Sequence, residues 1–292
     1  RDNGIYTLSE GKPTLAKILK SNGYQTGSII GSFVLDHRFG LNQGFDLYDD
    51  RILENTATDL YTFPERNADQ VVSLGMDWLE KHKNEKFFLF LHIFDPHAIY
   101  KSPSPYKEIY RNSPYDGEIA YADAMIGKLL KKLEEWKLNE KTVIIIVGDH
   151  GESLGEHGEK THGLFLYKST LHVPVIMFGP SIPKGRTITT PIQNMDILPT
   201  LLDILDIKCP TVDGIDLVPL FNSKPVPNKY TQRYIYFETY LHLNYNWSLL
   251  RSIQREGWKY IEGPSPELYD VKLDPLEKTN IISSSNINAK SF

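Results

Sequence analysis

Residues 142–163 read TVIIIVGDHGESLGEHGEKTHG, an apolar run followed at once by a segment crowded with histidines, acidic residues and glycines. A short unbroken apolar run is typical of a strand that is covered on both faces of its sheet. The polar segment after it has two interpretations. It is either a solvated surface turn or a site where charge is handled, because titratable groups gather at functional sites.

The elements on either side of this stretch alternate between helices and strands. Strand-like apolar segments occupy residues 24–31, 87–94 (FFLFLHIF) and 173–179 (VPVIMFG). Apolar residues at helical spacing occupy residues 13–22, 67–83, 115–137 and 196–206. In residues 115–137 the predicted apolar face includes Ile119, Ala122 and Leu133. This alternation predicts an α/β fold with a mostly parallel central sheet sandwiched by helices.

The pattern changes in the last quarter of the chain. After Pro210 it becomes turn-rich and aromatic, with YIYFETY at 234–240 and WSLLRSIQREGWKYIEG at 247–263. Such segments predict antiparallel strands. We therefore expect an α/β core over residues 1–221 and a small antiparallel β-rich part over residues 222–292.

Composition excludes some classes of protein. The chain has 292 residues and a formal net charge of -5, so it lacks the basic surface of a nucleic-acid-binding protein. Its apolar runs are much shorter than the roughly 20 residues of a transmembrane helix. Cys209 is the only cysteine, which excludes intrachain disulfides. Residues 1–4 (RDNG) resemble the middle of a loop, and we expect sequence upstream of them.

Polar residues follow two of the predicted strands directly. The 87–94 strand leads into Asp95 and His97, and the 142–147 strand leads into Asp149 and His150. If these strands are parallel neighbours, the side chains emerge at one sheet edge, where α/β proteins bind ligands. Asp149 and His150 offer a carboxylate and an imidazole to a divalent cation. The alternative is structural: Asp149 caps a turn and His150 bonds a carbonyl. The His157–His162 spacing does not fit a zinc-protease motif.

Two further histidines are candidates for contacting an anion. His97 follows a proline, and an imidazole near neutrality donates hydrogen bonds or protonates a leaving oxygen. His162, with Lys160 nearby, is the second candidate; its alternative is an ordinary surface histidine. His92, His157 and His172 are interpreted as structural.

Several of these segments resemble the sulfatase family of the alkaline phosphatase superfamily. Residues 148–180 are similar to its second signature region, and FLHIFDPHAIYKSP at 90–103 is similar to its F-x-x-P-H segment. Residues 23–50, the helix at 196–206 and PELYDVKLDPLEKTNI at 266–281 also resemble family elements, in order along the chain. The resemblance implies the same α/β fold.

The resemblance also implies roles for individual residues. Asp149 and His150 match the late pair of metal ligands, usually for calcium, with magnesium or manganese as alternatives. His97 matches the histidine that contacts the sulfate and the leaving-group oxygen. His162 stands where many sulfatases have a sulfate-binding lysine, and Lys160 is the substitute for that role.

One part of the family's site has no match. The nucleophile is a formylglycine made from Cys or Ser in a C-x-P-x-R motif, and residues 209–212 (CPTV) lack the arginine. We expect the motif to lie upstream of Arg1. We therefore predict that this chain alone hydrolyses no sulfate ester and binds calcium poorly.

The predicted function of the complete protein is sulfuric ester hydrolysis, of a glycan or a small aryl or alkyl sulfate. Two alternatives remain: a phosphonate monoester or phosphodiester hydrolase of the same superfamily, and a non-catalytic binder of sulfated glycans. Segments 51–65, 99–114 and 241–247 are candidates for substrate specificity because they hold aromatic and basic residues. Family resemblance predicts a periplasmic or other extracytoplasmic location.

Overall fold

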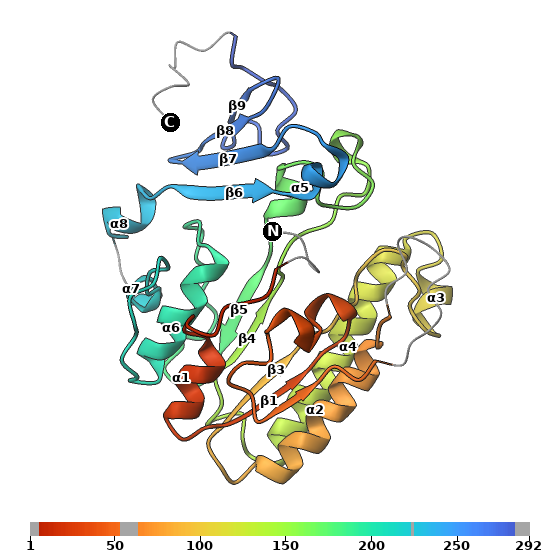
Figure 1. The fold of residues 1–292 in the computed structure, drawn as a ribbon, viewed down its shortest axis with the longest axis vertical. Coiled ribbons are helices and arrows are strands. Elements are labelled where there is room, and N and C mark those ends of the chain that lie inside the picture. The colour runs from red at the N-terminus through yellow and green to blue at the C-terminus, as the bar shows by residue number, and fades with distance from the viewer. Residues whose placement is uncertain (1–5, 53–63, 223–224, 284–292) are drawn as a thin grey trace. The chain divides into compact units, whose positions relative to one another are not determined.

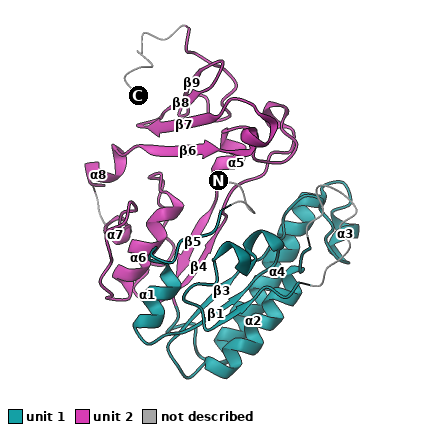
Figure 2. Cartoon of the chain, viewed as in Figure 1, with its two compact units in different colours: residues 1–142 teal, residues 143–292 magenta. Residues whose placement is uncertain are grey.

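The computed structural model describes residues 6–52, 64–222 and 225–283 (Figure 1). Contacts between residues divide the chain into two compact units, residues 1–142 and 143–292 (Figure 2). Residues 1–4 and most of the 51–65 segment, both singled out in the sequence, lie outside the described residues. The boundary near residue 222 stays a prediction.

The first unit contains the predicted parallel sheet. Its strands are β1 (Gln25–Ile29), β2 (Leu47–Asp49) and β3 (Phe87–Leu91), in the order β2-β1-β3. Both neighbours run parallel to β1, with Gly27 opposite Leu47 on one side and opposite Leu89 on the other. The carboxyl ends of all three strands therefore meet at one edge, as the alternation of elements predicts.

Four helices accompany this sheet: α1 (Leu15–Ser21), α2 (Ala68–His82), α3 (Tyr106–Ile109) and α4 (Pro114–Glu135). In Figure 1, α1 lies on one side of the strands and α2 and α4 lie on the other. The α2 helix approaches the sheet closely because Gly27 and Gly75 lack side chains. A Cβ atom would lie 2.6 Å from the Trp78 ring at Gly27, and 2.7 Å from Leu91 at Gly75. The sandwich of helices and parallel sheet is confirmed.

Two expectations about this unit are wrong. Phe90 in β3 is 41% exposed rather than covered, because β3 is an edge strand of the described sheet. Ile119 was expected on the apolar face of α4, yet it is 43% exposed. The buried face of α4 instead contains Glu118, Tyr121, Ala122 and Met125, of which Tyr121 and Met125 pack with Ala68 and Val72 of α2.

The second unit begins with β4 (Ile144–Val147) and β5 (Val175–Phe178), which pair antiparallel. A mostly parallel sheet was expected to include both. The segment between them forms only short helical turns, including α5 (Lys168–Leu171), and a parallel crossover usually needs a longer helix. The α6 (Ile197–Ile204), α7 (Val218–Asn222) and α8 (Asn228–Thr231) helices follow, and Pro199 lies in the first turn of α6, as expected.

The chain ends in the predicted antiparallel sheet. It contains β6 (Ile235–Thr239), β7 (Leu250–Arg255), β8 (Trp258–Glu262) and β9 (Glu267–Asp270), in sequence order. Each neighbouring pair is antiparallel. Across the described residues, no helix is both long and apolar enough to span a bilayer.

Each unit contains a buried ion pair. In the first, Arg66 donates to an Asp49 carboxylate oxygen at 2.6 Å and to the carbonyl oxygens of Ile30, Asp49 and Arg51. Burial opposes ionisation of Asp49, but hydrogen bonds from Arg51 and Arg66 outweigh it and lower its pKa to about 2. In the second, Arg233 donates two hydrogen bonds to the fully buried Asp196. Losing one partner of such a pair leaves an uncompensated buried charge.

Candidate functional site

His97 lies in the turn that follows β3, at the carboxyl end of the parallel sheet. Its Nδ1 atom donates to the Ala98 carbonyl oxygen at 2.6 Å, since a carbonyl can only accept. The ring stacks on Phe94 with centroids 4.1 Å apart and planes 21° apart. These two contacts place the proton of the neutral ring on Nδ1 and fix the direction of Nε2.

Glu118 of α4 holds the backbone of this turn. Its Oε2 atom accepts from the His97 backbone N–H at 3.0 Å, and its Oε1 atom accepts from the Lys101 backbone N–H. Glu118 is 5% exposed, so both hydrogen bonds are shielded from water. One carboxylate therefore binds both ends of the turn formed by residues 97–101.

The same carboxylate belongs to a small acidic pocket. Its lining combines three acidic side chains with an arginine and the catalytic candidate: Glu65, Arg66, Asn67, Phe94, Asp95, His97 and Glu118. Burial raises the pKa of Glu118 to about 7, and the Asp95 and Glu65 charges add to the rise. Burial also raises the pKa of Asp95 to about 6 and raises that of Glu65. Asp95 Oδ2 is buried, and no hydrogen bond to it is found among the described residues.

Asp149 and His150 follow β4 and lie at the surface, with side chains 82% and 42% exposed. Asp149 Oδ1 accepts from the His150 backbone N–H at 2.9 Å, and His150 Nδ1 donates to the Gly151 carbonyl at 2.9 Å. These are the local bonds that the structural interpretation predicts. They leave Asp149 Oδ2 and His150 Nε2 3.7 Å apart and facing each other. This oxygen and nitrogen pair can contribute two ligands to a cation.

The Asn194 side chain holds the backbone of the turn that contains Asp149. Its side-chain amide donates to the carbonyl oxygens of Gly148 at 3.1 Å and of Asp149 at 3.4 Å. Gly151 is required here because a Cβ atom would lie 2.2 Å from the Ser169 carbonyl oxygen. The backbone of the predicted metal ligands is therefore held by Asn194 at Gly148 and Asp149 and by close packing against Ser169 at Gly151.

The structure brings His162 next to His150. Their ring centroids are 4.1 Å apart, and His162 Nδ1 lies 3.0 Å from a carboxylate oxygen of Glu152. The Glu152 side chain is only 4% exposed, so this contact fixes the His162 ring from the buried side of the ring. Lys160 is exposed two residues away. His157 is structural, as predicted: it stacks on Tyr167 and bonds the Leu276 carbonyl.

A second buried glutamate holds the backbone beside His162. Glu159 is 3% exposed and accepts from the backbone N–H groups of Leu164 at 2.6 Å and Phe165 at 3.1 Å. Burial raises its pKa, while these two bonds oppose the rise. Glu118 in the first unit and Glu159 in the second therefore each bind two backbone N–H groups of a turn through a buried carboxylate.

Sequence patterns assigned no site role to Glu65, Glu118, Glu152 or Glu159, and Asp95 was named only as a polar residue that follows the 87–94 strand. Glu118 could have been found, because it lies three and seven residues before the buried Tyr121 and Met125, on one helix face. A buried carboxylate on such a face needs partners. Glu65 is distant in sequence from the other two acidic residues of the pocket, Asp95 and Glu118, and no local pattern linked it to them.

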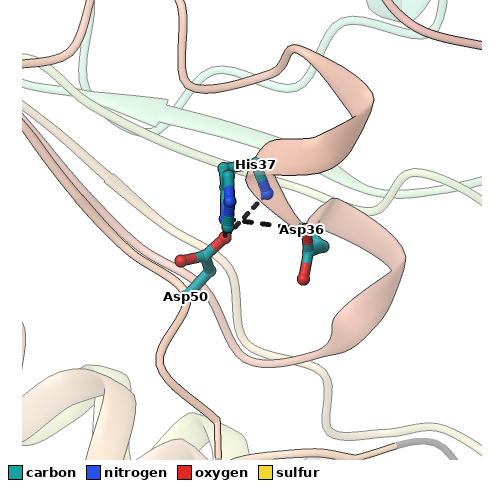
Figure 3. Close-up of side chains that lie close together, drawn as sticks. All are labelled: Asp36, His37 and Asp50. Carbon is teal, nitrogen blue, oxygen red and sulfur yellow. Dashed lines mark hydrogen bonds and ion pairs between the residues drawn. The ribbon is translucent and has the colours of Figure 1, made fainter.

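A further cluster lies in the first unit, outside the predicted set. Asp36, His37 and Asp50 place one potential ligand atom each within 4.8 Å of one another (Figure 3). Asp36 is bound by the Arg38 guanidinium at 2.9 Å, and Asp50 accepts from the backbone and ring of His37 at 2.6 and 2.7 Å. These bonds cap and hold the 36–40 turn, so the cluster is explained by local structure.

Comparison with known families identifies the fold around these residues. The Sulfatase family model matches residues 6–207. This chain belongs to the sulfatase family. A second model, N-sulphoglucosamine sulphohydrolase, C-terminal, matches residues 155–290. The family match includes every residue predicted for the site.

Individual relatives of this sulfatase family member have related names. Arylsulfatase K of Homo sapiens is 33% identical over 179 residues, covering 57% of this chain and 32% of the relative. Choline-sulfatase of Rhizobium meliloti (strain 1021) is 32% identical over 177 residues, with the same coverages of 57% and 32%. The chain thus spans about a third of the length of the curated relatives it matches.

Solved structures share the sulfatase fold over nearly the whole chain. BT4656, in complex with its substrate D-glucosamine-2-N,6-O-disulfate, has a TM-score of 0.82 at 20% identity, covering 99% of this chain and 81% of that chain. The phosphonate monoester hydrolase of Silicibacter pomeroyi has a TM-score of 0.75 at 17% identity, covering 97% and 78%. At these identities the likeness shows the fold alone.

The predicted site residues fall in both units. His97 lies in the first, and Asp149, His150, Lys160 and His162 lie in the second. Within the second unit the structure joins Asp149, His150 and His162 into one group. The proximity of His97 to that group stays a prediction, as do the roles of all five residues.

Proposed function

We propose that the full-length protein is a sulfuric ester hydrolase whose substrate is a sulfated glycan. The observation that carries this proposal is the group formed by Asp149, His150 and His162 after β4, in a chain of the sulfatase family. Sulfate ester cleavage places negative charge on the transferred group and on the departing oxygen. Cationic and hydrogen-bonding groups at both ends stabilise that charge, each donor contributing roughly 2–4 kcal/mol.

The residues present fit part of a divalent cation site. Asp149 Oδ2 and His150 Nε2 are exposed and face each other, and a carboxylate oxygen suits calcium, magnesium or manganese. We propose calcium as the ion, with its remaining ligands supplied by other segments of the full-length protein. When bound, such an ion supplies Lewis-acid stabilisation of the sulfate oxygens.

The histidines are proposed to act at the two ends of the reacting ester bond. His97 acts in its doubly protonated form: Nδ1–H donates to the Ala98 carbonyl, and Nε2–H faces the leaving oxygen and transfers its proton to it as the bond breaks, which leaves the neutral ring with its proton on Nδ1. His162, held by Glu152, donates to a sulfate oxygen, and Lys160 is the alternative donor.

Cys209 is not proposed as the nucleophile. It lies in the loop after α6, and burial raises the pKa of its thiol, with the Asp216 charge adding to the rise. A nucleophilic cysteine needs the opposite perturbation. We propose instead that the nucleophile is a formylglycine in the full-length protein and that residues 1–292 alone turn over no sulfate ester.

The proposed glycan substrate is supported by an aromatic pair on the 241–247 loop, which contains the short 3-10 helix Leu241–Tyr245. Tyr245 and Trp247 are 52% and 58% exposed, with ring centroids 5.0 Å apart and planes 30° apart. The buried His242 anchors this loop through the Leu164 and Ser248 carbonyl oxygens, at 2.7 and 2.6 Å. Thr239 also donates to the Gly163 carbonyl at 2.5 Å. The exposed rings are thereby tied to the backbone next to His162, where they could stack on a sugar ring.

Turnover of three substrate classes by the full-length protein tests the function. We expect hydrolysis of 4-nitrophenyl sulfate and release of sulfate from a sulfated oligosaccharide, with at least about 100-fold lower kcat/KM for phenyl phosphonate esters, a difference of about 3 kcal/mol. The reverse preference would favour the phosphonate monoester hydrolase suggested by the Silicibacter fold match. Binding of the oligosaccharide without any turnover would favour a glycan-binding protein. Turnover by residues 1–292 alone would contradict the proposal that the nucleophile lies outside these residues.

A further inference from the structure

We infer that Glu118 is a positioning residue for His97: its carboxylate on α4 fixes the 97–101 turn and so aims the imidazole. The inference rests on the proposed function, in which His97 protonates the leaving oxygen. Its geometric basis is independent of that function. Two backbone N–H groups, of His97 and Lys101, converge on one side chain that comes from a different element.

The convergence of two donors explains why the residue is an acid. A carboxylate offers an acceptor oxygen to each N–H group. A glutamine has one acceptor oxygen, and its NH2 group would face the second N–H donor. A buried donor left without a partner costs about 1–3 kcal/mol, so the turn would shift to regain one. Because His97 begins the turn, such a shift moves its ring.

Protonation of Glu118 should weaken the same contact. Burial and neighbouring carboxylates raise its pKa to about 7, so a proton arrives on this acceptor in the neutral pH range. The charged or titratable groups around it come from two segments: Glu65 and Arg66 before α2, and Asp95, His97 and Lys101 after β3. Arg66 is engaged by Asp49 and by backbone carbonyls, and the Lys101 charge acts on Glu65. The full clamp is therefore present above about pH 7 and weakens below it.

The test follows the Lys101 backbone amide in full-length protein labelled with 15N-lysine. An amide bound to a carboxylate changes its chemical shift when that carboxylate is protonated. We expect a pH midpoint near 7 in the wild type. The transition should vanish in Glu118→Gln and should persist in His97→Gln, which removes the imidazole at the other end of the turn. Glu65→Gln is the matched control: it removes a neighbouring charge and should move the midpoint to lower pH.

Kinetics provide the second readout, with 4-nitrophenyl sulfate as the probe. We expect Glu118→Gln to lower kcat on the order of 100-fold while KM changes by less than about 3-fold, since a misplaced group costs chemistry more than binding. If Glu118→Gln does not fold, Glu118→Asp is used, because its shorter chain reaches only one of the two N–H groups.

The outcomes separate this inference from the proposed function. A Lys101 amide that does not titrate, or that titrates equally in Glu118→Gln, overturns the clamp. An unchanged kcat in an active Glu118→Gln enzyme overturns the positioning role. If the protein hydrolyses no sulfate ester yet the titration follows Glu118, the proposed function fails and the clamp stands as a structural contact without a catalytic role.

Discussion

The two histidine-bearing turns of this sulfatase family member are each held by a buried glutamate, but the charges around the two glutamates differ. Glu118 binds two backbone N–H groups at the His97 turn, and Glu159 binds two at the His162 turn. Burial raises the pKa of both glutamates. The Asp95 and Glu65 charges add to the rise at Glu118, whereas at Glu159 the His162 charge opposes the rise and the Glu152 charge adds to it. A buried glutamate therefore fixes the turn in either case, but the charges around Glu118 act in one direction, whereas those of His162 and Glu152 act on Glu159 in opposite directions.

The largest expected effect is a loss of kcat when His97 is replaced, which would assign the catalytic role to the His97 turn. His97→Gln removes the proposed proton donor and should lower kcat for an aryl sulfate on the order of 100- to 1000-fold. His172→Gln, at an exposed histidine, is the control and should leave kcat unchanged. A fall of less than about 3-fold in His97→Gln would remove His97 from the mechanism.

The second prediction addresses the exposed pair after β4. Asp149→Asn removes the charged ligand and should weaken calcium binding to the full-length protein at least about 10-fold, since even outer-shell changes cost that much. Isothermal titration calorimetry measures the affinity. Asp213→Asn, which removes one exposed carboxylate elsewhere, should bind calcium like the wild type. Equal affinities in both variants would rule out Asp149 as a ligand.

The third prediction concerns how the stability of the protein depends on pH through Glu118, with Glu159 as the comparison. In the folded state the pKa of Glu118 is about 7 and that of Asp95 about 6, above their ordinary values of 4.5 and 3.8. The folded protein then holds these protons more tightly than the unfolded chain, so the free energy of unfolding should fall as pH rises from about 4 to about 7.

Urea denaturation at pH 5 and pH 8 measures this dependence. We expect Glu118→Gln to reduce the difference in unfolding free energy between the two pH values by about 1–2 kcal/mol, after allowance for solvent screening. Glu159→Gln should reduce it less, because the His162 charge opposes the rise in the pKa of Glu159, whereas the Asp95 and Glu65 charges add to that of Glu118. An equal effect of the two variants would contradict the contrast drawn between the turns.

The smallest expected effect concerns substrate binding by the exposed aromatic pair Tyr245 and Trp247. Trp247→Ala removes one ring of the exposed pair and should raise KM for a sulfated oligosaccharide about 3- to 10-fold, the equivalent of about 0.5–1.5 kcal/mol. KM for 4-nitrophenyl sulfate should not change. Trp247→Phe keeps an aromatic face and should restore most of the affinity. An equal rise for both substrates would indicate a general disturbance of the His162 turn.

Local patterns predicted most of the secondary structure. The 24–31 and 87–94 segments contain β1 and β3, and the 67–83 segment contains α2, because apolar periodicity and terminal residues act over a few positions. In α4 the same reasoning placed Ala122 and Leu133 correctly on the buried face, but it also placed the exposed Ile119 there and overlooked Glu118. Hydrophobicity alone could not anticipate a carboxylate that is buried to bind backbone donors.

The sequence by itself determined the α/β class, the polar residues that end β3 and β4, and membership of the sulfatase family. These depend on residues close together in the chain or on motifs preserved in order. Tertiary structure alone decided that Glu65, Asp95 and Glu118 share one pocket and that β4 pairs antiparallel with β5. Desolvation and hydrogen bonding depend on which distant segments pack together, so burial rather than residue type sets the pKa of Glu118 and the role inferred for it.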